Sequence, residues 1–171
     1  MYKCFLKVLA AEDPNNPNLN ECKDLLMVGS MGHASSIALG IALNKPSRNI
    51  VCLDGDGAML MHMGIMSTIG SSKLRNLKHI LLNNATHDSV GQQPTTGYHT
   101  NFVDVAKACG YTWHKSVNSA EDVKAAVIEL MKKDGPAFLE IRVRPGAKKD
   151  LGRPNETPIH NKKAFMSFLN K

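Results

Sequence analysis

The stretch Asp54-Gly55-Asp56-Gly57 places two carboxylates directly after an apolar run, residues 50–53. A carboxylate between a strand and a helix is suited to bind a hard cation such as Mg²⁺. The glycines allow a ligand to approach the backbone closely, and the N–H groups of Gly57 and Ala58, at the start of the helix, suit a phosphate. The same pattern is also typical of a plain turn in which the acid caps the helix. Both interpretations stay open at this point.

A pair of asparagines follows the next apolar run, residues 79–82. Asn84, the second of the pair, lies 28 residues after Asp56. One helix and one strand fill that interval, so we expect the two loops to lie side by side. An amide oxygen is a suitable ligand for a hard cation. The order strand, Gly-Asp-Gly, helix, strand, Asn-Asn therefore predicts one site that binds a metal ion together with a phosphate-bearing ligand.

These loops must be positioned by regular elements, which the hydrophobic pattern predicts. We expect strands at 25–29, 49–53, 79–82, 111–117 and 137–143, and helices at 34–46 (ending before its proline), 58–72, 101–110, 120–133 and 161–170. Such alternation is typical of an α/β fold with a parallel sheet and helices on both faces. Ligands of such sheets bind at the carboxyl ends of the strands, where the loops 29–33, 54–57 and 83–93 fall.

The domain organisation predicted is simple. Residues 1–24 are rich in turn-forming residues and are expected to form an irregular N-terminal segment. The remaining residues, 25–171, have the length of one ordinary domain. No apolar run reaches the roughly 18 residues needed to cross a bilayer, so we expect no association with a membrane.

Charge and aromatic content limit the classes of partner. The net charge is +6, and the excess of basic residues lies late in the chain, at Arg142, Arg144, Lys148, Lys149, Arg153, Lys162 and Lys163. Aromatic residues make up only 5% of the chain, and none stands among these charges as a stacking platform, which argues against nucleic acid. A small, multiply anionic ligand fits these charges, as does an ordinary solvated surface.

The four cysteines are Cys4, Cys22, Cys52 and Cys109, and no two are spaced as a CxxC pair. This usage is typical of free thiols in a reducing compartment. We therefore expect a cytoplasmic protein and no zinc site.

The Gly-Asp-Gly and Asn-Asn pattern resembles the thiamine diphosphate-binding motif of a large enzyme superfamily. The resemblance implies that Mg²⁺ is bound by Asp56, Asn84 and the backbone carbonyl of Thr86. It also implies that the loop of Gly55 to Ala58 holds the diphosphate of the cofactor, with Ser89 as a further candidate for the same role.

A second segment, "VGSMGHASSIALGIAL" (28–43), resembles the pyrimidine-binding segment of the same superfamily. By this resemblance the Gly29 carbonyl accepts a hydrogen bond from the exocyclic amine of the cofactor, and the backbone of Met31 contacts the pyrimidine, with Ser30 and Gly32 beside it. The Met31 side chain would support the bent cofactor, since a flexible thioether fills irregular space. An ordinary apolar loop residue remains the alternative for Met31.

Over residues 25–169 the chain resembles one particular family within this superfamily. The segments "GSMGHASSIALGIALNKP", "DGDGAMLMHMG", "NNATHDSVGQQPT" and "FLEIRVRPGAKKDLGRP" are similar to the phosphonopyruvate decarboxylase family, with sulfopyruvate decarboxylases as near relatives. The family usually reads HDSVGGQPT, and this chain has Gln92 in place of the second glycine. We expect Gln92 to add bulk and to exclude a positive φ beside the cofactor.

The resemblance implies an activity: decarboxylation of phosphonopyruvate to phosphonoacetaldehyde and CO₂, dependent on thiamine diphosphate and Mg²⁺. His33 and His87 border the cofactor loops and are candidates to donate a proton or to bind the anionic substrate. The alternative for each is a loop histidine that bonds to the backbone. Sulfopyruvate and other 2-oxoacids are alternative substrates.

One expected residue is missing. In the superfamily a glutamate from a companion pyrimidine domain activates the cofactor, and no glutamate of this chain stands in a matching motif. We therefore expect the chain to be the diphosphate-binding domain alone, inactive by itself and part of an oligomer. Its partner would be a pyrimidine-domain polypeptide or a homologous full-length subunit. A non-catalytic fragment that assembles with a full-length enzyme is the other interpretation.

Overall fold

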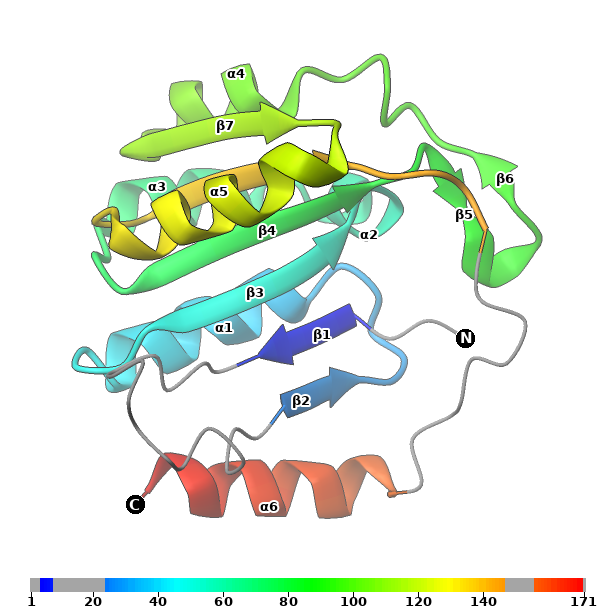
Figure 1. Ribbon diagram of the computed structural model, residues 1–171. Helices are drawn as coiled ribbons and strands as arrows, with labels where there is room; N and C mark the ends of the chain where they lie inside the picture. The colour runs from blue at the N-terminus through cyan, green and yellow to red at the C-terminus, as the bar shows by residue number, and fades with distance from the viewer. Residues whose placement is uncertain (1–3, 8–23, 147–155, 171) are drawn as a thin grey trace.

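A six-stranded sheet forms the centre of the computed structural model, which describes residues 4–7, 24–146 and 156–170. The strand order is β2-β1-β3-β4-β8-β7 (Figure 1). The central and outer strands β3 (Ile50–Gly55), β4 (Leu77–Asn83), β8 (Ala137–Arg142) and β7 (Trp113–Val117) are parallel to one another. The predicted parallel sheet is confirmed, and its four strands begin and end close to the predicted residues.

Two further strands extend the sheet beyond β3, and of these only β1 runs opposite to the others, as its arrow shows (Figure 1). β1 (Cys4–Lys7) pairs antiparallel with both β2 (Asp24–Met27) and β3. The expectation that residues 1–24 are irregular is therefore wrong for 4–7, and the rest of that segment up to residue 23 lies outside the described residues. β3 would otherwise present unpaired backbone groups along its outer edge, and β1 satisfies them.

In the described part of the chain, six helices pack around the sheet, and they cover both of its faces as predicted (Figure 1). They are α1 (Ala34–Asn44), α2 (Asp56–Met61), α3 (Ile65–Ser72), α4 (Phe102–Cys109), α5 (Ala120–Lys132) and α6 (Pro158–Leu169). The larger core lies between the sheet and buried residues of α1, α2, α3, α4 and α6. The smaller core lies under α5, in front of the sheet in Figure 1.

Alternation along the strands divides the side chains between the two cores. On β8, Phe138 belongs to the larger core, whereas Leu139 and Ile141 belong to the smaller one. Successive side chains of a strand point to opposite faces, so Glu140 shares the face of Phe138. This places a buried carboxylate on the same side of the sheet as α1, α3 and α4.

The helix predicted over 58–72 is in fact two helices. α2 ends at Met61, the following His62 donates its N–H to the Met59 carbonyl (3.2 Å), and α3 begins after Gly64. Glycine lowers helix stability by about 1 kcal/mol relative to alanine, which favours a break at this place. Because of this break, α2 is a short helix that contains only residues 56–61 and begins at Asp56.

The polar stretch 83–93, predicted to be a loop, includes part of a small hairpin. β5 (Thr86–His87) and β6 (Gln93–Pro94) are antiparallel and are joined through a 3₁₀ turn at Asp88–Val90. The hairpin stands at the carboxyl ends of β3 and β4, at the right of Figure 1. The sequence shows only its polar composition, because strands this short have no periodicity to detect.

The outer edge of β2 is covered by α6. Asn161 accepts a hydrogen bond from the Leu26 N–H (3.0 Å) and donates one to the Asp24 carbonyl (3.1 Å). Thr157 caps the helix by accepting from the His160 N–H (3.2 Å). α6 thus satisfies edge groups of the sheet that would otherwise be open to another strand.

Among the described residues, none of the helices combines the length and the apolar character needed to span a membrane.

Replacement of Gly70 by alanine is expected to destabilise the fold. A Cβ at Gly70 on α3 would lie 1.8 Å from the Cys109 carbonyl oxygen at the end of α4, so the two helices would have to separate. We expect Gly70→Ala to lower the free energy of unfolding by about 2 kcal/mol or more, since overpacking of a core typically costs ~1–3 kcal/mol. Urea denaturation measures this change.

The matched control is Gly40→Ala on α1. Gly40 is exposed, and nothing lies within 4 Å of an added Cβ. Alanine should stabilise this helix by ~0.5–1 kcal/mol. Equal denaturation midpoints for the two variants would contradict the close packing of α3 against α4.

Candidate functional site

A cavity of about 230 Å³ opens at the carboxyl edge of the sheet, between the ends of β3, β4 and β8. It brings together most of the residues that the sequence singled out for cofactor binding, metal binding or catalysis. These are Met31, Gly55, Asp56, Gly57, Ala58, Asn84, Thr86, His87 and Ser89. The predicted residues Gly29, Ser30, Gly32 and His33 are not among those that line the cavity.

Asp56 is the central acid of the cavity, and only 1% of it is exposed. It begins α2 immediately after β3, with Gly55 extended before it. One carboxylate oxygen, Oδ1, accepts a hydrogen bond from the Asn84 N–H (3.2 Å), and the other, Oδ2, accepts one from the Thr95 hydroxyl. The two loops predicted to lie side by side are therefore joined by a direct hydrogen bond.

Asn84 and Thr86 offer oxygen atoms next to Asp56. The side-chain Oδ1 of Asn84 accepts from the Thr86 N–H (3.1 Å), and its Nδ2 donates to Asp88 (2.8 Å). A carboxylate or amide oxygen has two lone pairs, so the oxygens of Asp56 and Asn84 each keep one for a further partner. A set of hard oxygen donors around a buried carboxylate fits Mg²⁺.

Asp88 is a site residue that sequence reasoning missed. Its carboxylate accepts from the Asn84 amide, from the Thr86 hydroxyl (2.8 Å) and from the Gly146 N–H (2.9 Å). It therefore ties the loop after β4 to the segment after β8. The only signal in the sequence is its place in the "NNATHDS" run, which gives no indication of the bond to Gly146.

His87 lies inside the site and His33 outside it. A Cβ at Gly57 would meet the His87 Nδ1 atom at 2.4 Å, so the imidazole rests directly on the start of α2. His33 is exposed, its Nδ1 lies 3.2 Å from the Ser30 carbonyl, and its ring centroid lies 4.1 Å from that of His62. Of the two candidate histidines, the structure brings only His87 to the cavity.

The segment 29–32 is a turn with unusual backbone angles. Gly29, Ser30 and Gly32 have φ values of 76°, 46° and 88°. A Cβ at Gly32 would lie 2.7 Å from the Ala58 carbonyl oxygen, so a glycine is required where this turn packs against α2. The turn presents the Met31 side chain to the cavity.

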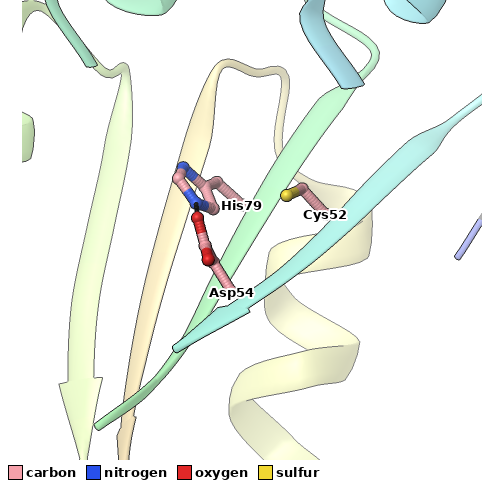
Figure 2. A group of neighbouring side chains, drawn as sticks. All are labelled: Cys52, Asp54 and His79. Atoms are coloured by element: carbon pink, nitrogen blue, oxygen red, sulfur yellow. Dashed lines mark ion pairs between the residues drawn. The ribbon is translucent and has the colours of Figure 1, made fainter. Parts of the chain in front are cut away.

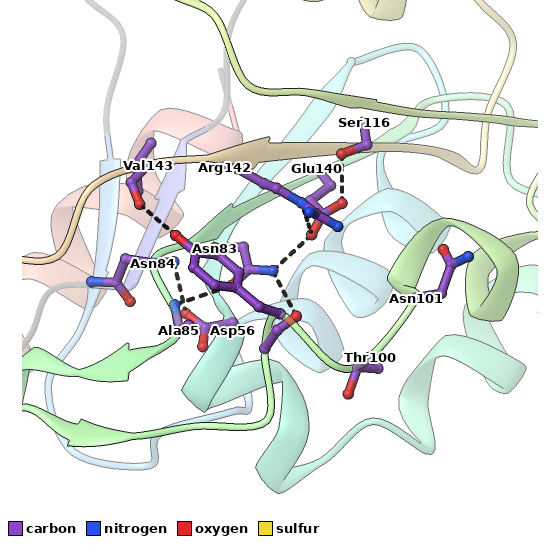
Figure 3. Close-up of polar contacts among 12 residues, drawn as sticks. Asp56, Asn83, Asn84, Ala85, Thr100, Asn101, Ser116, Glu140, Arg142 and Val143 are labelled. Atoms are coloured by element: carbon purple, nitrogen blue, oxygen red, sulfur yellow. Dashed lines mark hydrogen bonds and ion pairs between the residues drawn. The ribbon is translucent and has the colours of Figure 1, made fainter.

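Behind the cavity lies a buried network centred on Asn83, the first residue of the Asn-Asn pair (Figure 3). Its Nδ2 donates to Glu140 (2.7 Å) and to the Gly97 carbonyl (2.9 Å). Its Oδ1 accepts from the Ala85 N–H (3.2 Å), and its carbonyl accepts from the Val143 N–H (2.8 Å). The sequence analysis singled out the Asn-Asn pair, but it gave no sign that Asn83 would be buried and bonded to Glu140.

A second buried group lies beneath the loop, on β3 and β4 (Figure 2). Asp54 accepts from the Gly55 N–H (3.0 Å), and its other oxygen is 3.6 Å from the His79 Nε2. The His79 Nδ1 lies 3.2 Å from the Tyr111 hydroxyl. Burial raises the pKa of Tyr111 well above its usual value, so that hydroxyl stays protonated and can donate to His79.

One atom each from Cys52, Asp54 and His79 lies within 4.8 Å of the others. The bonds of Asp54 and His79 give these residues a structural role in holding the start of the Gly55–Gly57 loop. Asp54 thus supports the loop, while Asp56 faces the cavity.

The backbone at Gln92 differs from the prediction. Gln92 has φ of 62°, in the left-handed region, and its N–H donates to the His87 carbonyl (3.0 Å). The expectation that glutamine excludes a positive φ here is therefore wrong. The hydrogen bond that closes the hairpin holds the residue in this conformation, which costs a non-glycine residue roughly 1–2 kcal/mol.

The late basic residues separate into distinct environments. Arg144 lines the cavity. Arg142 lies 3.5 Å from the Glu140 carboxylate and over the Tyr98 ring at 5.8 Å from its centroid. Lys148, Lys149 and Arg153 lie outside the described residues.

Comparison with known proteins assigns the family. The family model described as "Thiamine pyrophosphate enzyme, C-terminal TPP binding domain" matches residues 13–141. The 4-hydroxybenzoylformate decarboxylase of Rhodococcus jostii RHA1, a thiamine diphosphate-dependent enzyme, has a similar fold. Its TM-score is 0.58 at 22% identity, over 69% of this chain and 24% of that chain.

Curated relatives agree with this match. The phosphonopyruvate decarboxylase of Streptomyces viridochromogenes is 39% identical over 143 residues, which are 84% of this chain and 36% of that protein. The sulfopyruvate decarboxylase subunit beta of Methanococcus maripaludis is 32% identical over 149 residues, which are 87% of this chain and 79% of that subunit. The chain thus spans about a third of the first protein and most of the second. The chain belongs to the thiamine pyrophosphate enzymes and matches their C-terminal cofactor-binding domain.

Proposed function

We propose that the chain is the diphosphate-binding part of a decarboxylase that uses thiamine diphosphate and Mg²⁺ to act on a small anionic 2-oxoacid. Phosphonopyruvate, which gives phosphonoacetaldehyde and CO₂, is the proposed substrate. The observation that carries the proposal is the Asp56 carboxylate, buried at the carboxyl edge of the sheet and bonded to the loop of Asn84. The name and 39% identity of the Streptomyces relative support the choice of substrate.

The site residues divide into three groups by what they would hold. Asp56, Asn84 and the Thr86 carbonyl would bind Mg²⁺. The N–H groups of Gly57 and Ala58, with Ser89, would bind the diphosphate, and all three residues line the cavity. The Gly29 carbonyl, with Ser30, Met31 and Gly32, would contact the pyrimidine, and the left-handed turn at 29–32 leaves Gly29 and Ser30 exposed to do so.

The cofactor supplies the electron sink for decarboxylation, and the protein supplies binding, orientation and proton transfer. Asp56 and Asn84 would hold the metal end of the cofactor, and Met31 also lines the cavity. His87 rests against Gly57 and is the residue that we propose holds or moves a proton near the bound substrate. Arg144 adds a positive charge to the cavity wall, where it would attract an anionic substrate.

The proposed enzyme is an oligomer in which another polypeptide completes the site. None of the four described glutamates, Glu121, Glu129, Glu140 and Glu156, lines the cavity. The cavity of about 230 Å³ is also smaller than the roughly 300–1,000 Å³ of typical ligand pockets. A pyrimidine-domain polypeptide or a homologous full-length subunit would supply the missing wall. A cytoplasmic location is part of the same proposal and rests on the cysteine pattern.

Sulfopyruvate is the second candidate substrate. The sulfopyruvate decarboxylase subunit beta of Methanocaldococcus jannaschii is 46% identical to this chain over 89 residues, which are 52% of this chain and 47% of that subunit. The chain also covers 79% of the Methanococcus maripaludis subunit, whose name marks it as one part of a larger enzyme. A role without catalysis, as a fragment assembled with a full-length enzyme, is the alternative if no partner restores turnover.

Loss of the proposed metal ligands should abolish tight binding of the cofactor. We expect Asp56→Ala and Asn84→Ala each to weaken Mg²⁺-dependent binding of thiamine diphosphate at least tenfold, because each removes one of few protein ligands. Isothermal titration calorimetry on the full chain measures this, with circular dichroism to verify folding.

The control for this titration is Asp134→Asn. Asp134 forms an exposed salt bridge with Arg75 (2.5 Å), away from the cavity, and exposed pairs contribute little to stability. Its loss should leave binding unchanged. Binding by Asn84→Ala at the affinity of the unaltered chain would contradict the metal assignment.

Turnover should require a partner. We expect the isolated chain to release no CO₂ from phosphonopyruvate or sulfopyruvate, and a mixture with a pyrimidine-domain polypeptide to decarboxylate one of them. A coupled CO₂ assay with both substrates in parallel identifies the preferred head group. Full turnover by the isolated chain would refute the need for a partner, and a mixture inactive on both substrates would favour the role without catalysis.

A further inference from the structure

Glu140 is a buried acid that the proposed chemistry does not use. It lies in the middle of β8 with 1% of its surface exposed, between the buried apolar residues Leu139 and Ile141. Its Oε1 accepts from the Asn83 amide (2.7 Å), and its Oε2 accepts from the Ser116 hydroxyl (2.6 Å). Burial of a carboxyl group costs several kcal/mol unless partners satisfy it, so its place here requires these specific bonds.

Asn83 transmits the position of Glu140 to the candidate metal-binding loop. Its side chain is held from one side by Glu140 and from the other by the Gly97 carbonyl (2.9 Å). Both bonds use its Nδ2, which fixes the orientation of the amide and leaves Oδ1 facing the Ala85 N–H (3.2 Å). Figure 3 shows this chain of bonds from β8 to the loop.

Ala85 is the strained residue of the loop. Its φ is 56°, in the left-handed region, which is unfavourable for an alanine because its Cβ crowds the backbone. Ala85 stands between Asn84 and Thr86, the two loop residues proposed to bind the metal. A strained backbone persists only where its surroundings hold it, and the bond from Asn83 Oδ1 to the Ala85 N–H is one such restraint.

The same network reaches Asp56 by a second route. The Gly97 N–H donates to the Thr95 hydroxyl oxygen (3.0 Å), and that hydroxyl donates to Asp56 Oδ2. A Cβ at Gly97 would lie 2.5 Å from Asn83 Oδ1 and 2.6 Å from Asp56 Oδ2. Asn83, Gly97 and Asp56 are therefore packed closely, with no room for a side chain between them.

We propose that Glu140 and Asn83 are positioning residues that preorganise the proposed metal-binding loop. Glu140 holds the side chain of Asn83, and Asn83 in turn fixes the backbone of Ala85. Asn84 and Thr86, on either side of Ala85, are thereby held against Asp56. This inference rests on the proposed binding of Mg²⁺ at Asp56 and Asn84. Groups that orient metal ligands from behind typically change metal affinity 10–100-fold when they are removed. Glu140 acts through Asn83 and does not itself touch the cavity.

The experiment is a calorimetric titration of Mg²⁺ into the full chain in the presence of thiamine diphosphate. We expect Glu140→Leu to raise the Kd for Mg²⁺ 10–100-fold. Glu140→Gln should stay within about threefold of the unaltered chain, because an amide oxygen can still accept from Asn83 and its NH₂ can donate to the Ser116 hydroxyl. This rescue separates loop positioning from a general loss of buried volume.

Leu139→Val is the matched control on the same strand. Leu139 is equally buried but faces the smaller core under α5. Leu139→Val should lower the urea midpoint of unfolding, because it removes a buried methyl group, without changing the Kd for Mg²⁺. An increase in Kd equal to that of Glu140→Leu would mean that any core destabilisation weakens the site, and would overturn the proposal.

A second variant and a second measurement test the same proposal, so that it does not depend on the result for Glu140→Leu alone. Asn83→Ala should weaken Mg²⁺ binding as much as Glu140→Leu, and the double variant should be no weaker than either single one, because both act through one chain of bonds. In the metal-free chain, hydrogen exchange at the Ala85 amide should be faster in Glu140→Leu than in Leu139→Val.

The outcomes distinguish the two proposals. If the unaltered chain binds no Mg²⁺ with thiamine diphosphate, the proposed function fails, and this inference fails with it. If the unaltered chain binds Mg²⁺ and both Glu140→Leu and Asn83→Ala bind it equally well, only the positioning role is refuted. Additive effects of the two substitutions would also refute it.

Discussion

The hydrogen bond from the Asn84 N–H to the Asp56 carboxylate is the interaction on which the site depends. It joins the loop after β3 to the loop after β4, and it exists because these strands are parallel neighbours with Gly55 paired to Leu82. In parallel pairing both carboxyl ends meet at one edge of the sheet. The two hydrophobic cores pack against both faces of the sheet and hold the strands in this register. The polar residues at the edge of the sheet are therefore already close to one another.

The polar groups behind this bond explain why the edge is rigid. Asp54 and His79 support the start of the β3 loop from one side. Glu140 and Asn83 support the β4 loop from the other, and Thr95 links that support to Asp56. All of these groups except Thr95 are almost entirely buried. The buried polar groups of Glu140 and Asn83 are hydrogen-bonded at both ends, and such bonding fixes one arrangement of a structure, which is what a site for a small hard cation requires.

Much of the fold and the central residues of the site could be predicted from the sequence. The strands β3 and β8 stand out because each begins with a buried apolar run, and the distance from Asp56 to Asn84 corresponds to one helix and one strand. The site could be predicted to that extent because Asp56 and Asn84 each directly follow a strand, and these two strands are neighbours both in the sequence and in the sheet.

The remaining features depend on contacts that a sequence pattern does not contain. Glu140 looks like an ordinary residue of the last strand, and its partner Asn83 lies 57 residues away. Asp88 meets Gly146 at a separation of 58 residues. Gln92 adopts the left-handed backbone because the hairpin closes around it, whereas its residue type argues against that conformation. The strand β1 is too short to stand out in a segment rich in turn residues.

The family assignment and the geometry agree on what part of an enzyme this chain provides. Its cavity is lined by the polar residues Asp56 and Asn84, which we propose bind the metal, and by the apolar residues Met31, Leu53 and Ala58. The described glutamates lie away from it. A site of this kind can hold the metal and diphosphate of a cofactor, and a second polypeptide would have to enclose the rest.

The most direct test of this account is a crystal structure of the chain grown with Mn²⁺ and thiamine diphosphate, because Mn²⁺ can be located by its anomalous scattering. The account predicts one strong anomalous peak coordinated by the Asp56 carboxylate, the Asn84 Oδ1 and the Thr86 carbonyl, with the diphosphate at Gly57 and Ala58. A peak bound instead by Asp88, or by Cys52, Asp54 and His79, with none at Asp56, would contradict it.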